Sequence, residues 1–291
     1  MSNRMKINAT GWFFIAIATV VITLFYFYPM AQALILSFQS GLGANLSFVG
    51  FDNYIRLFHD PTFITAITNT FIYLLVQVPV MIVLGLFLSV LLNDKKLKFK
   101  GLFRTAIFLP VITSLVAYSV IFKYLFATDG VLNQFLVKFS IIPEAIEWLT
   151  DPFWAKVTII IAITWRWTGY NMIFYLSALQ NVDQSIYEAA RIDGASAFKV
   201  FTRITIPMLK PIILFTSITS TIGTLQIFDE IMNITGGGPG NATTSISQYI
   251  YNLSFKYTPD FGYATAVSFV IVILIILFTA LQFRVAGDKN D

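Results

Sequence analysis

Six long apolar stretches constrain the fold of this 291-residue chain more than any other feature of its sequence. A helix needs about 20 apolar residues to cross the roughly 30 Å hydrocarbon core of a bilayer. The composition agrees, because 57% of the residues are hydrophobic and only 12% are charged, against about 25% charged in a soluble domain. The sequence predicts an all-α polytopic membrane protein, a single transmembrane domain over residues 1–291. Its six expected spans are approximately 12–36, 66–92, 104–126, 153–176, 209–228 and 263–283.

The first stretch has some features of a secretory signal peptide. It follows two basic residues and contains Ala31-Gln32-Ala33, which resembles a signal-peptidase site. Its apolar core over residues 12–28 is longer than the roughly 7–15 residues usual in signal peptides. We therefore expect a retained membrane anchor rather than a segment cleaved after Ala33.

The distribution of basic residues predicts the orientation of the chain. With a cytoplasmic N-terminus, the cytoplasmic segments hold 13 of the 19 Lys and Arg residues, and such an excess is expected on that side. These residues are Arg4, Lys6, Lys95, Lys96, Lys98, Lys100, Arg104, Arg191, Lys199, Arg203, Lys210, Arg284 and Lys289. The outside loops hold acids such as Asp52, Asp60, Asp129, Glu144, Glu147 and Asp151. Both termini are therefore expected in the cytoplasm.

The residue types exclude several kinds of chemistry. The chain has no cysteine and one histidine, His59, which argues against disulfides, thiolate or histidine metal clusters and a Ser–His triad. No G-x-x-x-x-G-K-[ST] phosphate loop occurs, so the chain is not expected to bind or hydrolyse ATP itself. We expect no catalytic residue, metal site or cofactor in this chain. The basic residues have an explanation in the membrane, so no nucleic-acid partner is expected.

The segment at about 182–207, between the fourth and fifth spans, is more than a short connector. Asp183 or Ser185 can cap a helix, because a side-chain oxygen at that position accepts from free backbone N–H groups. Gly194 can end this helix in a left-handed conformation. The first half of the segment therefore predicts a short helix followed by a turn.

The second half of the segment predicts another short helix. Ser196 can start it, and Pro207 is expected to stop it just before the fifth span. The result is a helix–turn–helix under the membrane. It either covers the helices of this chain or offers apolar and ionic groups to a partner.

This segment closely resembles the coupling loop of importer-type ABC permeases. The family pattern is E-A-A, three residues, G, nine residues, I-x-L-P. Glu188-Ala189-Ala190, Gly194 and Ile204-Thr205-Ile206-Pro207 match it with both spacings, and only Ile206 replaces a leucine. A second run, Thr235-Gly236-Gly237-Gly238-Pro239, could be only a tight external turn. It also resembles a loop typical of the first of the two unlike permease chains in maltose- and glycerol-phosphate-type sugar importers.

The resemblance implies the fold of a type I ABC importer permease in the bacterial cytoplasmic (inner) membrane. It implies a second homologous permease chain and two cytoplasmic ATPase subunits that bind ATP and Mg. It also implies an external or periplasmic solute-binding protein that delivers a carbohydrate. The residues implied to contact an ATPase are Glu188, Ala189, Ala190, Arg191, Asp193, Gly194 and Ala195.

The fourth and fifth spans carry candidates for a substrate pathway. Thr216, Ser220 and Thr224 are spaced by four and share one helical face. Such hydroxyls can bind a sugar or simply pack between membrane helices, and aromatic rings can stack on sugars or fill a core. The candidate pathway residues are Trp165, Arg166, Gly169, Tyr170, Asn171, Ser220, Gly223, Thr224 and Gln226.

Arg166 is the exceptional charge, because it falls near the middle of the fourth span. A charge at that depth is costly and usually faces a cavity or a partner. Asp229 and Glu230, at the outer end of the fifth span, are expected to be too distant for a direct ion pair. We expect Arg166 to meet the aqueous pathway or the companion permease, with snorkelling or bonding to nearby carbonyls as the alternative.

Two other classes of protein remain open at this point. An ion-coupled secondary transporter would need buried acids, and none lies deep within the six expected spans. A structural subunit without a pathway is also compatible with the sequence. If the chain imports a solute, a disaccharide, an oligosaccharide, a uronate fragment and a glycerol phosphate all remain candidates.

Overall fold

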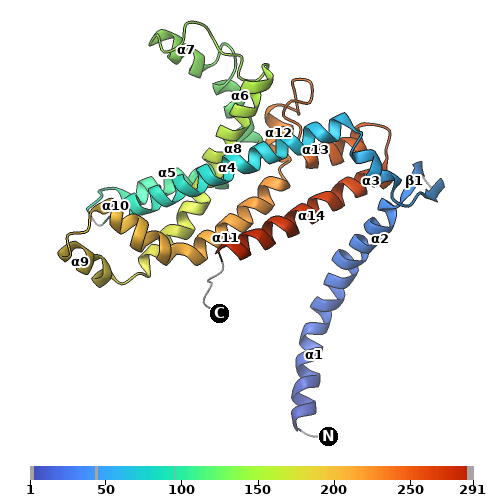
Figure 1. The fold of residues 1–291 in the computed structure, drawn as a ribbon, viewed down its shortest axis with the longest axis horizontal. Coiled ribbons are helices and arrows are strands. Elements are labelled where there is room, and N and C mark those ends of the chain that lie inside the picture. Colours follow the sequence, from blue (N-terminus) through green and yellow to red (C-terminus); the bar gives the residue numbers. More distant parts are fainter. Residues whose placement is uncertain (1–2, 43–44, 95, 287–291) are drawn as a thin grey trace. The chain divides into compact units, whose positions relative to one another are not determined.

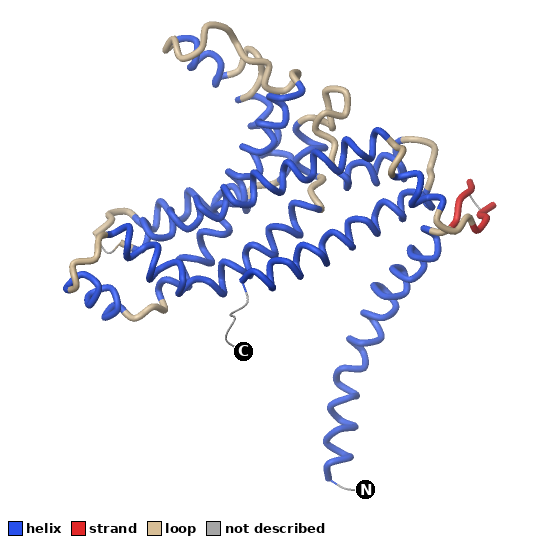
Figure 2. The backbone as a smooth tube through the Cα atoms, viewed as in Figure 1, coloured by secondary structure: helices blue, strands red, loops and turns tan. Residues whose placement is uncertain are grey.

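A computed structural model describes residues 3–42, 45–94 and 96–286, whose secondary structure consists of helices joined by loops and one short hairpin (Figures 1 and 2). Lys95 and Lys289, two of the expected cytoplasmic basic residues, lie outside the described residues. The chain divides into two compact units. Unit 1 comprises Met1–Asp60 and Ile250–Val270, and unit 2 comprises Pro61–Tyr249 and Ile271–Asp291.

Unit 1 begins with a long apolar helix and ends with a small polar network. Its elements are α1 (Asn3–Ile22), η1 (Thr23–Phe27), α2 (Tyr28–Ser37), β1 (Gln39–Leu42), β2 (Asn45–Phe48), α3 (Asp52–Leu57), η3 (Asn252–Lys256) and the first part of α14 (Phe261–Ala286). Strands β1 and β2 pair antiparallel, with Gln39 opposite Phe48. From Trp12 to Tyr28 most side chains are apolar and exposed, so this part of the helix offers an apolar surface to lipid.

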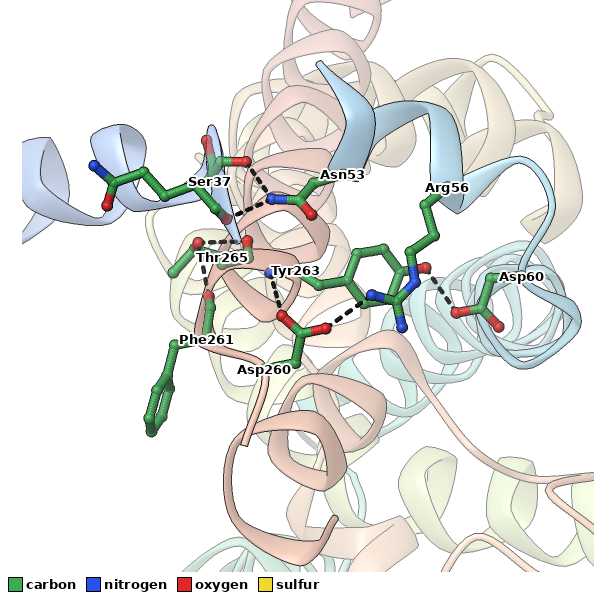
Figure 3. Close-up of polar contacts among 10 residues, drawn as sticks. Ser37, Asn53, Arg56, Asp60, Asp260, Phe261, Tyr263 and Thr265 are labelled. Atoms are coloured by element: carbon green, nitrogen blue, oxygen red, sulfur yellow. Dashed lines mark hydrogen bonds and ion pairs between the residues drawn. The ribbon is translucent and has the colours of Figure 1, made fainter. Parts of the chain in front are cut away.

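Polar side chains connect α3 of unit 1 to the hairpin and to the start of α14 (Figure 3). Asn53 donates to the backbone oxygens of Ser37 and Gln39 over 2.9 and 2.8 Å. Arg56 pairs with Asp260 at 2.8 Å, and its guanidinium lies 3.9 Å from the centre of the Tyr263 ring. These contacts give α3 a defined place although the helix has only six residues.

Unit 2 contains the remaining helices, packed mainly around α4 and α8. They are α4 (Pro61–Asn93), α5 (Lys100–Ile112), α6 (Leu115–Leu125), α7 (Val131–Lys138), α8 (Pro152–Gln180), α9 (Gln184–Ile192), α10 (Ala197–Val200), η2 (Phe201–Thr205), α11 (Ile206–Leu225), α12 (Asp229–Ile234), most of α13 (Ile246–Tyr251) and the end of α14. Glycine allows close packing: a Cβ on Gly85 of α4 would lie 3.1 Å from the Tyr175 ring of α8. Fully buried Ala66, Ala155 and Ala162 add to this tight contact surface.

Among the described residues, four helices are long and apolar enough to cross a membrane. They are Gly11–Ser37, Pro61–Asn93, Ala197–Leu225 and Phe261–Val285, and a fifth span results if α5 and α6 together make one. Helix α8 has 29 residues, enough to cross, but Lys156, Arg166 and Asn171 interrupt its apolar sequence. The expected all-helical membrane fold is confirmed, whereas the count of six spans is not established by length and composition.

The expected third span, 104–126, is not one continuous helix. Helices α5 and α6 meet at an angle of 102° around Thr113 and Ser114. Pro110 lacks an N–H near the end of α5, and the Ser114 hydroxyl accepts from the Ala117 N–H at 3.2 Å, which starts α6 as a new helix. In Figure 1, α5 runs beside α4 and α8 and α6 turns away from them.

The expectation that Pro207 stops the helix before the fifth span is wrong. Residues Ala197–Leu225 form a single 29-residue helical span, and Pro207 lies in the first turn of α11. The π turn η2 comes directly before it, with the Ile206 N–H bonded to the Phe201 oxygen. A wider π turn relieves the clash between a proline ring and the preceding turn, so the helix continues.

Candidate functional site

A cavity of about 500 Å³ lies inside unit 2, between α4, α8, α11 and α12. Seven of the nine predicted pathway residues line it: Arg166, Tyr170, Asn171, Ser220, Gly223, Thr224 and Gln226. The lining is mixed, since apolar Met81, Leu115, Ile163 and Ile227 alternate with amides, hydroxyls and aromatic rings. The cavity therefore offers hydrogen bonds and apolar contact at the same place.

Two predicted pathway residues lie elsewhere. Trp165 stacks on the Tyr118 ring of α6, with ring centres 6.0 Å apart and planes within 5°. Gly169 packs against α5, because a Cβ there would lie only 2.2 Å from the Ile107 oxygen. Both belong to the packing of α8 against its neighbours, on helix faces turned away from the cavity lining.

The cavity lining also includes residues outside the nine predicted ones: Gln77, Trp167, Thr219, Asp229 and Glu230. Gln77 is an amide within a largely apolar stretch, a signal that could have pointed to it. Its Oε1 accepts a 2.7 Å hydrogen bond from the Thr224 hydroxyl, and both side chains are buried. This bond joins α4 to α11 at the cavity wall.

Asn171 is fully buried and has unused hydrogen-bonding capacity. Its amide nitrogen donates to the Trp167 oxygen at 3.2 Å and to the Ser220 hydroxyl at 3.5 Å. Its Oδ1 atom is buried with no hydrogen-bond partner. An unpaired buried acceptor is costly, so a ligand in the cavity that donates to this oxygen would stabilise the site.

Charges of both signs line the cavity. Arg166 is 7% exposed and Glu230 is 6% exposed. The Trp167 indole N–H donates to a Glu230 carboxylate oxygen at 3.3 Å. Glu230 belongs to the short helix α12 rather than to a spanning helix, and burial raises the pKa of its carboxyl group. Among the described residues, no direct ion pair joins Arg166 to Glu230.

Arg166 combines two of the environments that the sequence left open. Its Nη1 and Nη2 atoms donate to the backbone oxygens of Thr113 and Val111, over 3.3 and 3.4 Å. The same side chain lines the cavity. It therefore bonds to nearby carbonyls and also faces the cavity.

The predicted coupling segment adopts the local structure expected for its first helix and turn. The Asp183 carboxylate accepts from the Ser185 N–H at 2.9 Å and caps α9, and this bond lowers the pKa of Asp183. Gly194 has φ +70°, a left-handed conformation suited to glycine. The Ser196 hydroxyl accepts from the Lys199 N–H at 3.3 Å and caps α10.

The predicted ATPase-contact residues are mostly accessible in this chain. Glu188, Ala189, Arg191, Asp193 and Gly194 are exposed, Ala195 is half-buried and Ala190 is buried. Ile192 and Phe198 are 86% and 76% exposed, large values for apolar side chains. The segment thus presents apolar and charged groups together.

The glycine–proline run forms a turn that packs on α4. Gly236, Gly237 and Gly240 all have positive φ, as the turn requires. Asn69 of α4 donates to the Thr244 oxygen over 3.0 Å. The turn is therefore held against a spanning helix, close to α12, which contributes Asp229 and Glu230 to the cavity. In the part of the chain that the structure describes, no group of three or more metal-ligating side chains comes together.

Comparisons with known proteins agree with this architecture. The model of the family described as binding-protein-dependent transport system inner membrane component matches residues 55–287. The lactose transport system permease protein LacF of Rhizobium radiobacter is 56% identical over 285 residues, covering 97% of this chain and 96% of the relative. The arabinooligosaccharides transport system permease protein AraP of Bacillus subtilis (strain 168) is 33% identical, covering 97% and 90%.

Solved structures show the same fold. A bacterial ABC transporter involved in the import of the acidic polysaccharide alginate contains a chain that superposes with a TM-score of 0.86 at 22% identity, with 100% of both chains covered. A complex of the bacterial alginate ABC transporter with an alginate pentasaccharide-bound periplasmic protein gives a TM-score of 0.85 at 23% identity, covering 98% and 96%. At these identities the likeness shows the fold alone.

The fold and the matching residues define a multi-pass inner-membrane permease. The chain belongs to the binding-protein-dependent transport system inner membrane components, within the sugar permeases of ABC transporters. ATP hydrolysis in such a transporter takes place in partner ATPase subunits, and the permease itself holds no cofactor. Membership of this family sets aside an ion-coupled secondary transporter.

Proposed function

We propose that the cavity of unit 2 is part of the route by which a carbohydrate crosses the membrane. The observation that carries the proposal is the buried, unpaired Oδ1 atom of Asn171, beside hydroxyls and rings in a cavity of about 500 Å³. Small-molecule sites typically measure about 300–1,000 Å³ and combine apolar walls with a few fixed polar groups. A sugar suits such a wall, because its hydroxyls donate and accept while its C–H faces stack on aromatic rings.

The relatives support a saccharide as the solute. Their names include transport of lactose, of arabinooligosaccharides and of multiple sugars. The chain covers nearly the whole of the lactose permease at 56% identity. We therefore propose a neutral di- or oligosaccharide, with lactose as the first compound to test.

The proposed membrane arrangement has six spans, with α8 as one and the bent α5–α6 pair as another. Both termini then lie in the cytoplasm, and so does α9. A second, homologous permease would complete the pathway. The T-G-G-G-P run favours this chain as the first of the two unlike permeases.

The coupling segment would dock on the ATPase subunits, and an external binding protein would deliver the sugar. Helical continuity from Ala197 to Leu225 supports this mechanism. A push on α10 would reach the cavity wall on α11 through one continuous helix. ATP-driven closure would therefore move packed helices as rigid bodies between two arrangements.

Asn171→Leu tests the pathway, because leucine has a similar size and no polar atoms. The transporter would be reconstituted in liposomes with its binding protein, and ATP-driven lactose uptake measured. We expect uptake to fall at least about tenfold, the effect of losing a buried hydrogen-bonding group. Asn181→Leu, at the exposed end of α8, is the matched control and should retain uptake. Normal uptake by Asn171→Leu would refute the role of the cavity.

Disulfide crosslinking tests the docking proposal independently. The chain has no native cysteine, so Glu188→Cys on α9 provides a single thiol. It should crosslink to a cysteine introduced into the partner ATPase, in an ATP-dependent manner. Lys138→Cys on α7, expected on the opposite side of the membrane, should not. Crosslinking from Lys138→Cys alone would reverse the proposed orientation.

A further inference from the structure

The break between α5 and α6 has a charged side chain from another helix at its centre. We propose that Arg166 is a positioning residue that holds the α5–α6 bend and links it to occupancy of the cavity. The link to occupancy rests on the proposed carbohydrate pathway. The role in the bend rests on contacts within unit 2 alone.

The first arm of the bend is held through backbone oxygens. Val111 and Thr113 lie at the C-terminus of α5, where carbonyls lack partners within the helix and carry partial negative charge. Arg166 donates to both oxygens, over 3.4 and 3.3 Å. A cation in this position offsets the partial negative charge at the end of α5. It also donates hydrogen bonds to carbonyls that have no partner within the helix.

The second arm is held through an aromatic ring. The Arg166 guanidinium lies 5.2 Å from the centre of the Tyr118 ring, which belongs to α6. Tyr118 is 1% exposed, and Trp165 stacks on its ring. A cation over a buried ring is attracted by the π electrons. Arg166, which belongs to α8, therefore contacts both α5 and α6.

The same guanidinium has donors to spare. It carries five N–H groups, and its buried Nε has no hydrogen-bond partner. The two bonds to the break are longer than the usual 2.9–3.0 Å, so they are weak for charge-assisted bonds. A sugar oxygen that accepts from Arg166 in the cavity would compete with Val111 and Thr113 for its donors. Occupancy of the cavity would then change the restraint on the bend.

Distance measurement across the bend tests this proposal in the complete transporter. Spin labels would be attached at Leu102→Cys in α5 and Tyr124→Cys in α6, both well exposed in this chain. At about 1.5 Å rise per residue, a change of about 20° in the bend moves the second label by about 5 Å. Pulsed electron paramagnetic resonance resolves such a shift.

The main variant is Arg166→Met, which removes the donors and keeps an apolar chain of similar reach. We expect a shifted or broadened distance distribution and at least about tenfold lower lactose uptake. Arg104→Met is the matched control: Arg104, which lies on α5, also donates to a helix carbonyl, that of Leu92, at 3.3 Å. It has no contact with the break and should leave the distance unchanged.

A wild-type distance distribution in Arg166→Met would overturn the proposal. Arg166→Lys keeps the charge and can reach one carbonyl, so it should give an intermediate distance distribution. If the methionine variant does not assemble, the lysine variant is measured in its place. Adding lactose to the wild-type transporter should shift the distribution towards that of Arg166→Met. Normal lactose uptake without such a shift would overturn the link to the cavity, whereas absence of uptake by the wild type would refute lactose as the solute.

Discussion

Tyr73 on α4 donates a 2.9 Å hydrogen bond from its hydroxyl to the backbone oxygen of Thr243, 170 residues further along the chain. Tyr73 and Thr243 are both completely buried. The bond holds the end of the glycine–proline turn against the helix that also carries Gln77 of the cavity wall. The turn is thereby part of the core of unit 2 rather than a free connector.

Tyr73→Phe should destabilise the permease by about 1–3 kcal/mol, because it leaves a buried carbonyl without its donor. The ring is kept, so packing is preserved and the hydrogen bond alone is lost. Thermal unfolding of the purified transporter would measure the change. Tyr124→Phe, at an exposed tyrosine, should stay within about 0.5 kcal/mol of wild type. Equal stability of the two variants would contradict the role given to this bond.

Gly169→Ala should separate α5 from α8, since the new Cβ would lie 2.2 Å from the Ile107 oxygen. A backbone atom cannot rotate away as a side chain does, and overpacking of this kind costs about 1–3 kcal/mol or more. We expect a lower yield of assembled transporter and a lower unfolding temperature. Gly101→Ala, on α5, places its Cβ where no atom lies within 4 Å and should be neutral. A neutral Gly169→Ala would show that the two helices are less closely packed than described.

Asp183→Ala should loosen α9, whereas Asp183→Asn should not, because asparagine is an equally good helix cap. Hydrogen exchange of the α9 amides, measured by mass spectrometry, distinguishes the two variants. The cap also predicts a pH dependence. Its hydrogen bond lowers the pKa of Asp183, so the stabilisation is present above the usual carboxyl pKa and is lost as the pH falls through the lowered value. After correction for the intrinsic pH dependence of amide exchange, protection of the α9 amides should fall at acid pH in the wild type and stay unchanged in Asp183→Asn.

Asp260 lets an ion pair be separated from a helix cap. Its carboxylate pairs with Arg56 at 2.8 Å and accepts from the Tyr263 N–H at 3.1 Å, which caps α14. Asp260→Asn should lose only the partly exposed ion pair, at a cost below about 1 kcal/mol. Asp260→Ala should also lose the cap, worth about 1 kcal/mol more. Chemical denaturation of the two variants would compare them, and a larger loss in Asp260→Asn would reverse this assignment.

The sequence predicts the local features that depend on a residue's type and its place in a helix. The cap at Asp183 and the left-handed Gly194 follow from residue type and position, and the structure confirms both. Asn171 and Thr224, two polar residues in apolar stretches, line the cavity, as the sequence predicts.

Where the position of a residue depends on the packing of several helices, the sequence alone does not predict it. Trp165 and Gly169 share a helix with the cavity residues, and only the positions of α5 and α6 show that they pack on those helices. Pro207 illustrates the opposite error, because a rule for ordinary helices failed where a π turn made room for the ring. The sequence places Glu230 at the outer end of the fifth span, and no local pattern indicates that α12 lines the cavity.

The π turn at Phe201–Thr205 also sets how α11 is rotated about its own axis relative to α10. One extra residue in a helical turn rotates everything beyond it by about 100° about the helix axis. A single inserted residue therefore sets the rotation of the hydroxyl face of α11 relative to the start of the helix at Ser196. When a partner holds the coupling segment, the turn therefore determines which side of α11 faces the cavity.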